Sequence, residues 1–334
     1  MTLETVVAVA LFVGVVAYAL LGGADFGSGF YDLIAGSSTR GAALRTLVDH
    51  SIGPVWEANH VWLIYVLVMW WTAFPTTFAV TMSTLIIPLL LALLGIVLRG
   101  ASFAFRKYSA TLGQARLFGA IFAGSSVLAP FFLGAAAGAV ASGRIPATGR
   151  GDLWSSWLNP TSLLSGTIAV TTCAFLAGTF LTADAARSGQ GDLAEQLRVR
   201  ALVVGTVTGL LVLVAIVPIS RDAPTLGAGL IGRAAPLIVA SVLTGTATLV
   251  LLARRRPGPA RFTAAAAVAT VVAGWGLAQY PWLLVDQVTI VDAAGAPATL
   301  RALLVAVALA GIVVIPPLIY LLRLTQSEAW SGHP

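Results

Sequence analysis

The chain has 334 residues, of which 58% are hydrophobic and only 10% are charged. Because soluble proteins carry about 25% charged residues, this composition excludes a soluble globular protein and indicates a multi-pass membrane protein. The net charge of +6 does not indicate nucleic-acid binding, since the basic residues lie in short gaps between apolar runs. A single cysteine, Cys173, excludes an intrachain disulfide and a cysteine-based metal site.

Runs without Asp, Glu, Lys or Arg predict the helices that cross the membrane. The first run follows Met1-Thr-Leu-Glu4, which lacks the basic start of a signal peptide, so we expect it to be retained as a helix. The second run, 58–98, is too long for one crossing and contains the turn sequence Phe74-Pro-Thr-Thr77, which predicts a helical hairpin.

The chain is therefore expected to be an all-α polytopic membrane protein with a single transmembrane domain over residues 1–334. About nine transmembrane helices are predicted. They cover residues 5–30, 54–73, 76–98, 117–141, 161–182, 201–219, 233–252, 262–284 and 302–322.

The basic residues predict the orientation of these helices. With the N-terminus outside, 14 of the 19 Lys and Arg residues fall in inner segments and 5 in outer segments. This bias is what the positive-inside rule predicts, and with nine crossings it places the C-terminus in the cytoplasm. If the run 58–98 crossed the membrane only once, every later segment would change sides, and the basic residues would no longer be concentrated in the inner segments.

Three polar residues stand out in the apolar N-terminal part of the chain. Asp25 lies near the predicted inner end of the first helix, and Glu57 and His60 lie in the first turns of the second, on one helix face. At this shared depth, partial desolvation can shift their pKa values toward neutrality, so that they can pass protons inward. Alternatively, the two acids cap helix ends or pair with Arg40 or Arg45 at the headgroup level.

The other polar residues point to no cofactor site. The three histidines, His50, His60 and His333, do not form a pair at matched depth on facing helices, so we expect no haem ligand and no metal site in this chain. The tryptophans fall mostly near predicted helix ends, as in interfacial belts. Asp292 lies in the outer loop before the last helix.

Two motifs stand in the first third of the chain, Gly22-Gly-Ala-Asp-Phe-Gly-Ser-Gly29 and Ser51-Ile-Gly-Pro-Val-Trp-Glu-Ala-Asn-His-Val-Trp-Leu-Ile64. They resemble motifs of subunit II of cytochrome bd-type quinol oxidases. The Phe74-Pro75 turn, the segment 98–106 and Thr289-Ile-Val-Asp-Ala293 add to the resemblance, which is thin from about 185 to 285. The residues of these motifs that we assign to the subunit interface or to the motif itself are Trp56, Asn59, Trp62, Gly23 and Gly27, with Asp292 in the outer loop.

The resemblance implies two four-helix bundles plus one peripheral helix. It also implies a heterodimer with a subunit I that carries b- and d-type haems and oxidises quinol, in a bacterial plasma membrane. Such a complex reduces dioxygen to water with protons from the cytoplasm. Subunit II would scaffold subunit I, ligate no haem, be inactive alone, and admit protons through Glu57, with Asp25 and His60 nearby.

Three residues depart from the family pattern. Many members carry a further acid where this chain has Gly22, many have Asp-Gly in place of Glu57-Ala58, and Gln or Glu is commoner in place of His60. The last two departures keep a group able to carry a proton.

A proton-coupled secondary transporter or exporter is the alternative function. Acids at helix mouths also couple substrates to protons, but transporters usually show repeated halves with broken helices near the midplane. No motif in the second half of this chain matches the first. The identity of the quinone, the presence of small accessory subunits and a bound structural lipid or quinone stay open.

Overall fold

The computed structural model describes residues 1–37, 39–52, 56–109 and 111–324, with the side chains of Trp56 and Glu57 outside the description. The described chain is almost entirely α-helical. Its elements in the first half are α1 (Leu3–Leu33), α2 (Ala42–Ile52), α3 (Trp56–Ala73), α4 (Pro75–Thr84), α5 (Ile86–Lys107), α6 (Leu112–Ala141) and α7 (Pro160–Arg187). Those in the second half are α8 (Gly191–Asp222), α9 (Pro224–Ile231), α10 (Ala235–Ala253), α11 (Pro257–Gln279), β1 (Trp282–Leu284), β2 (Val288–Thr289), α12 (Ile290–Ala293) and α13 (Pro297–Leu324).

Eight of the described helices are long and apolar enough to cross a membrane: α1, α5, α6, α7, α8, α10, α11 and α13. This confirms the predicted polytopic helical class. The 18-residue α3, which carries Glu57, is not among the eight. The count of nine crossings, the division into two four-helix bundles and the orientation therefore stay predictions.

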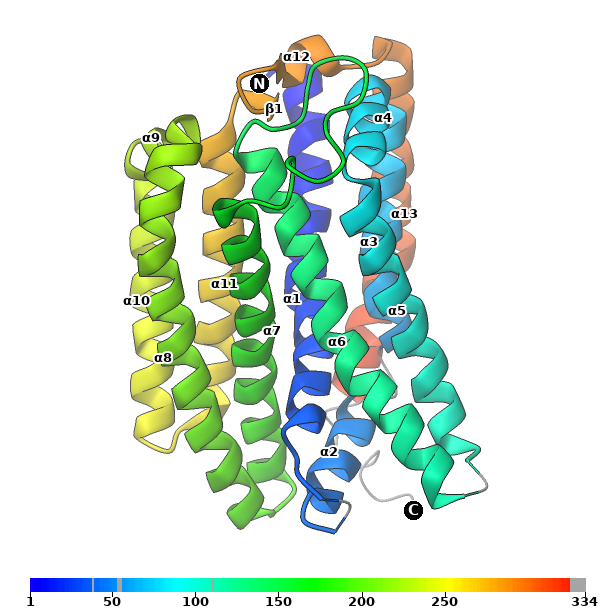
Figure 1. The fold of residues 1–334 in the computed structure, drawn as a ribbon, viewed down its shortest axis with the longest axis vertical. Helices are drawn as coiled ribbons and strands as arrows, with labels where there is room; N and C mark the ends of the chain where they lie inside the picture. Colours follow the sequence, from blue (N-terminus) through cyan, green and yellow to red (C-terminus); the bar gives the residue numbers. More distant parts are fainter. Residues whose placement is uncertain (38, 53–55, 110, 325–334) are drawn as a thin grey trace.

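The long helices run side by side, and their connections gather at two ends (Figure 1). One end, which we call the N-terminal end, holds the start of α1, the loop 142–159, α4, α9, α12 and the antiparallel β1–β2 ribbon. The other, which we call the α2 end, holds α2 and the turns after α5, α7 and α10. The helices α1 and α5 run in the same direction, with α2, α3 and α4 between them along the chain, and the long helices that follow α5 alternate in direction.

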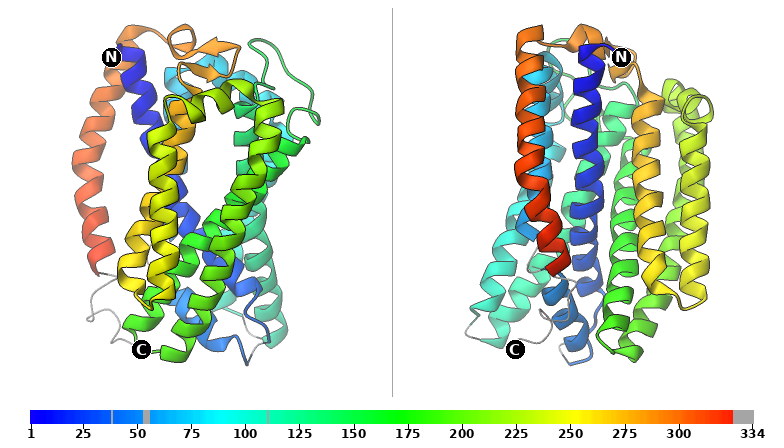
Figure 2. Two further views of the ribbon diagram at one scale, coloured as in Figure 1. Left: turned by 90° about the vertical axis from the view of Figure 1, so that its left-hand side faces the viewer. Right: turned by 180° about the vertical axis from the view of Figure 1, so that it is seen from behind.

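The helix α1 occupies the centre of the bundle and contacts α3, α6, α7 and α11. Packing this close needs small residues, and Gly27 is one of them. A Cβ atom at Gly27 would lie 1.9 Å from the backbone oxygen of Cys173 in α7. By contrast, α13 packs along α1 and α3 and lies at the periphery (Figure 2).

Several helices are longer than their predicted ranges. The helix α8 starts at Gly191, ten residues before the predicted start, and α5 continues through Arg99 to Lys107. The predicted ranges ended at charged residues, but a helix can carry charges in its end turns, where they reach each other or the headgroups. The predicted 76–98 helix is divided at Leu85 into α4 and α5.

Candidate functional site

The most completely buried charges of the described chain form one ion pair between α1 and α5. Both side chains are 1% exposed. Arg99 donates from Nη2 to Asp25 Oδ1 at 2.8 Å and from Nη1 to Asp25 Oδ2 at 3.0 Å. Such a bidentate arrangement is the strongest geometry for an arginine and a carboxylate.

The Arg99 guanidinium also makes contacts beyond the Asp25 carboxylate. Its Nε donates to Ser126 Oγ in α6 at 3.0 Å, and Nη2 also donates to the backbone oxygen of Asp25 at 3.0 Å. Its central carbon lies 5.2 Å from the ring centre of Phe26 and 4.9 Å from that of Phe122, within range of cation–π attraction. The pair thus connects α1, α5 and α6.

This pair lies deeper than the sequence predicted for Asp25. Eight residues of α1 follow Asp25, and eight of α5 follow Arg99, so the pair lies about 12 Å along the helix axes from the α2 end. The alternative pairing of Asp25 with Arg40 or Arg45 is not observed, because the partner is Arg99.

A second group of charges lies between this pair and the α2 end. Arg45 Nε lies 2.7 Å from Asp32 Oδ1, and Arg106 Nη1 lies 2.6 Å from Asp32 Oδ2. Arg106 also reaches Asp49 Oδ1 at 2.5 Å. This charge network joins the end of α1 to α2 and α5. The acidic partner of Arg45 is therefore Asp32 and not Asp25.

The sequence also singled out His60, in the second turn of α3. Its ring forms a triangle with those of Tyr18 and Phe26, at centroid separations of 6.2 and 5.8 Å, and the two aromatic rings lie 6.4 Å from each other. Phe26 therefore touches both His60 and the guanidinium of Arg99. The atoms His60 Nδ1 and Tyr18 Oη are buried and have no hydrogen-bond partner among the described residues, whereas most buried polar atoms have one.

The other predicted site residues fall into separate places. Gly23 and Gly27 are buried against α7 of the same chain, with the Cys173 thiol 3.5 Å from a Cβ atom built at Gly23. Asn59 is buried, and the ring of Trp62 meets the edge of Tyr65 at 6.1 Å. The side chains of Trp56 and Glu57 lie outside the described part of the chain.

Asp292 lies at the N-terminal end of the molecule, far along the helices from Asp25. It is exposed in α12, where its backbone N–H donates to Thr289 Oγ1 at 3.2 Å. Its carboxylate accepts from the same hydroxyl at 2.5 Å, which makes Asp292 part of a local helix cap.

Arg99 is the site residue that sequence reasoning missed, because it was counted as a charge of an inner segment. The available signal was the apolar stretch Ala101-Ser-Phe-Ala-Phe105 after it, which shows that the helix continues. Its partner could not be identified from spacing, since the two residues are 74 positions apart.

The described residues contain no group of three or more His, Cys, Asp or Glu side chains that could hold a metal ion. They do not fit a haem either. His60 is flanked by two aromatic rings, and His50 lies in the last turn of α2, outside the long helices. His333, the third histidine considered in the sequence analysis, lies outside the described residues.

The fold and the buried ion pair define a polytopic α-helical membrane protein that joins its central helices through charge. A family model described as cytochrome bd terminal oxidase subunit II matches residues 3–325. The chain belongs to this family, which confirms the resemblance read from the two motifs.

Two individual relatives align with parts of this sequence. The chain is 33% identical over 124 residues to cytochrome bd ubiquinol oxidase subunit 2 of Bacillus subtilis, covering 37% of this chain and 35% of that protein. It is 30% identical over 172 residues to cytochrome bd-I ubiquinol oxidase subunit 2 of Escherichia coli K12, covering 48% and 44%. These alignments span less than half of either relative.

A solved structure covers more of the chain. One chain of the bd oxidase from Geobacillus thermodenitrificans superposes with a TM-score of 0.80 at 27% identity, covering 97% of this chain and 98% of that one.

Proposed function

We propose that this chain is subunit II of a terminal quinol oxidase in a bacterial plasma membrane, where it scaffolds a haem-bearing subunit I and supplies protons from the cytoplasm. The observation that carries the proposal is the family match over residues 3–325. The superposition on a chain of a bd oxidase supports it over nearly the whole length. In this proposal the chain is inactive alone.

The electron-transfer chemistry is assigned to the partner. Subunit I would hold the b- and d-type haems, take electrons from quinol and reduce dioxygen to water. The donor set of the described residues supports this assignment, because no histidine pair in it suits a haem iron. The contribution of this chain is then to support the partner and to move protons.

The proposed proton route begins at Glu57 and His60. Both belong to the first two turns of α3, close to the α2 end, where the orientation prediction places the cytoplasm. The unpartnered Nδ1 of His60 is an atom that can accept or release a proton without breaking an existing bond among the described residues. A carboxylate one turn away on the same helix face can exchange protons with it.

Asp25, the third residue that the sequence predicted for the proton route, is assigned a different part here. A carboxylate held by both guanidinium nitrogens of Arg99 would have to leave a buried cation uncompensated in order to take up a proton. We therefore assign Asp25 a positioning role beside the route. Its partner Arg99 lies over the ring of Phe26, and this ring contacts His60. In this proposal Glu57 and His60 carry the protons.

The family match does not favour the alternative of a proton-coupled transporter. A direct experiment separates the two. The tagged chain is purified from its host membrane, and its subunits, haem spectrum and quinol-dependent oxygen consumption are measured. We expect a haem-bearing partner and oxygen consumption that is lost without this chain. Purification as a lone, haem-free chain would overturn the proposal.

A further inference from the structure

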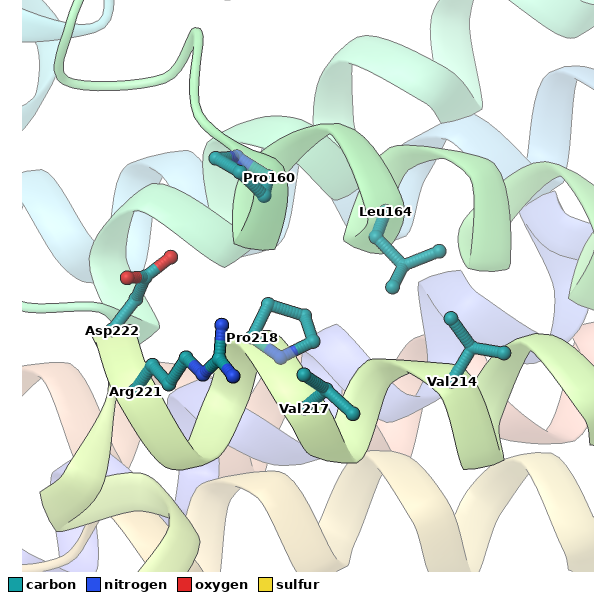
Figure 3. A pocket seen from close by; sticks show the side chains of 7 residues that line it. All are labelled: Pro160, Leu164, Val214, Val217, Pro218, Arg221 and Asp222. Carbon is teal, nitrogen blue, oxygen red and sulfur yellow. The ribbon is translucent and has the colours of Figure 1, made fainter.

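A pocket of about 500 Å³ opens between the first turn of α7 and the last turns of α8, at the N-terminal end of the molecule (Figure 3). Its size falls within the range of about 300–1,000 Å³ that is usual for small-molecule sites. Its walls include Leu164, Val214 and Val217. Val214 and Val217 are 57% and 54% exposed on a helix that carries many other exposed apolar side chains, so the pocket opens toward lipid.

Two prolines account for the space between these helices. Pro160 is the first residue of α7, and Pro218 lies inside α8 near its end. Pro218 has no N–H to donate to the carbonyl of Val214, four residues earlier, so this turn of α8 lacks one helical hydrogen bond. Figure 3 shows the two proline rings bordering the same gap, where they leave room that longer side chains would fill.

The mouth of the pocket carries two adjacent and opposite charges, Arg221 and Asp222. Asp222 Oδ2 accepts a hydrogen bond from Thr161 Oγ1 at 2.9 Å, which holds the carboxylate toward α7. Among the described residues Arg221 takes part in no ion pair, with Asp222 or any other acid. A free cation and a partly satisfied anion thus lie side by side above an apolar pocket.

We propose that this pocket binds one phospholipid whose head group carries both a phosphate and a primary ammonium group. Its phosphate would contact the Arg221 guanidinium, its ammonium would contact the Asp222 carboxylate, and an acyl chain would lie along Val214 and Val217. The paired charges match a zwitterionic head group better than a purely anionic one, which Asp222 would repel. The end of a membrane-crossing helix is the level at which head groups lie. The inference does not depend on the oxidase function.

The test uses the full chain, purified with the subunits that accompany it and exchanged into nanodiscs. The nanodiscs contain phosphatidylethanolamine, phosphatidylcholine or phosphatidylglycerol, and the lipid retained after detergent extraction is measured by native mass spectrometry. We expect one retained phosphatidylethanolamine, and retention lowered about tenfold by Arg221→Gln, as for loss of a charge-assisted hydrogen bond. Asp222→Asn should remove the preference for phosphatidylethanolamine over phosphatidylcholine.

Two pairs of variants separate the site from general effects. Val214→Trp fills the pocket and should abolish retention, whereas Val203→Trp places the same ring elsewhere on the lipid-exposed face of α8, at a residue that is 58% exposed. Arg221→Gln is matched by Arg233→Gln at the same end, whose guanidinium lies over Tyr280. Equal retention in Val214→Trp and Val203→Trp would overturn the pocket, and equal retention of the three lipids by the unmodified chain would overturn the head group.

Discussion

At the scale of single residues, the pair of Asp25 and Arg99 is the feature that most constrains the chain. Both charges are removed from solvent, and each compensates the other. Removing one member of a buried pair is costly because the remaining charge stays buried without a partner, whereas replacing both can be nearly neutral. The pair therefore has a structural role that can be separated from proton transfer by mutation.

Arg99→Met should lower the stability of the folded chain by about 3–5 kcal/mol, because it leaves the Asp25 carboxylate alone. The measurement is thermal unfolding in detergent, followed by fluorescence-detected size exclusion. The double variant Asp25→Asn/Arg99→Met should recover much of the loss. As a control, Arg187→Met breaks the exposed pair with Asp184 and should change stability by about 1 kcal/mol or less. A single Arg99→Met variant as stable as the parent would contradict this account.

Glu57→Gln should reduce quinol oxidase turnover about tenfold or more while the complex still assembles, because it removes a titratable group and keeps its size. Oxygen consumption and the yield of complex are measured on the same preparation. The matched control is Glu4→Gln in the first turn of α1, at the N-terminal end of the molecule. Full turnover in the Glu57 variant would remove this residue from the proton route.

At the scale of elements, the contact between α1 and α7 depends on a residue without a side chain. Gly27 approaches the backbone of α7 so closely that even a methyl group would overlap Cys173. Small residues permit such approaches between membrane helices, where packing rather than the hydrophobic effect drives association.

Gly27→Ala should therefore destabilise the chain, since α1 and α7 would have to separate, and the expected result is a lower thermal transition. Gly124→Ala is the matched control in α6. Gly124 has no atom within 4 Å of an added Cβ, so alanine there should leave stability unchanged or raise it by about 0.5–1 kcal/mol through helix propensity. If the Gly27 variant unfolds at no lower temperature than the Gly124 variant, α1 and α7 can separate at little cost in stability.

The elements also show what could be read from sequence and what could not. Apolar runs predicted where helices exist, because lipid requires backbone groups to be bonded within a helix. The start of α7 lies one residue from its prediction, since Asn159 caps it by accepting from the Ser162 N–H. The start of α8 lies ten residues away, because Glu195 and Arg198 pair within the helix instead of ending it. Asp25 was identified as unusual, but its partner depends on how α5 folds back.

At the scale of the whole molecule, the charges distinguish the two ends. The sequence assigned 14 basic residues to the inner segments, and one of these, Arg99, is buried in the bundle and paired. It therefore contributes nothing to the surface bias, but the remaining basic residues of the inner segments still outnumber the 5 of the outer segments. The bias continues to predict that the α2 end faces the cytoplasm. This orientation also decides from which side Glu57 could take protons.

Cysteine labelling in intact cells tests the orientation. Thr148→Cys places an exposed thiol in the loop 142–159 at the N-terminal end, and Gln190→Cys places one in the exposed turn between α7 and α8 at the α2 end. A membrane-impermeant maleimide should label the first variant directly and the second only after permeabilisation. The unmodified chain is the control, since its single cysteine, Cys173, lies within α7 and should stay unlabelled. Labelling of Gln190→Cys in intact cells would contradict the predicted orientation. It would also exclude a proton route from the cytoplasm through the α2 end.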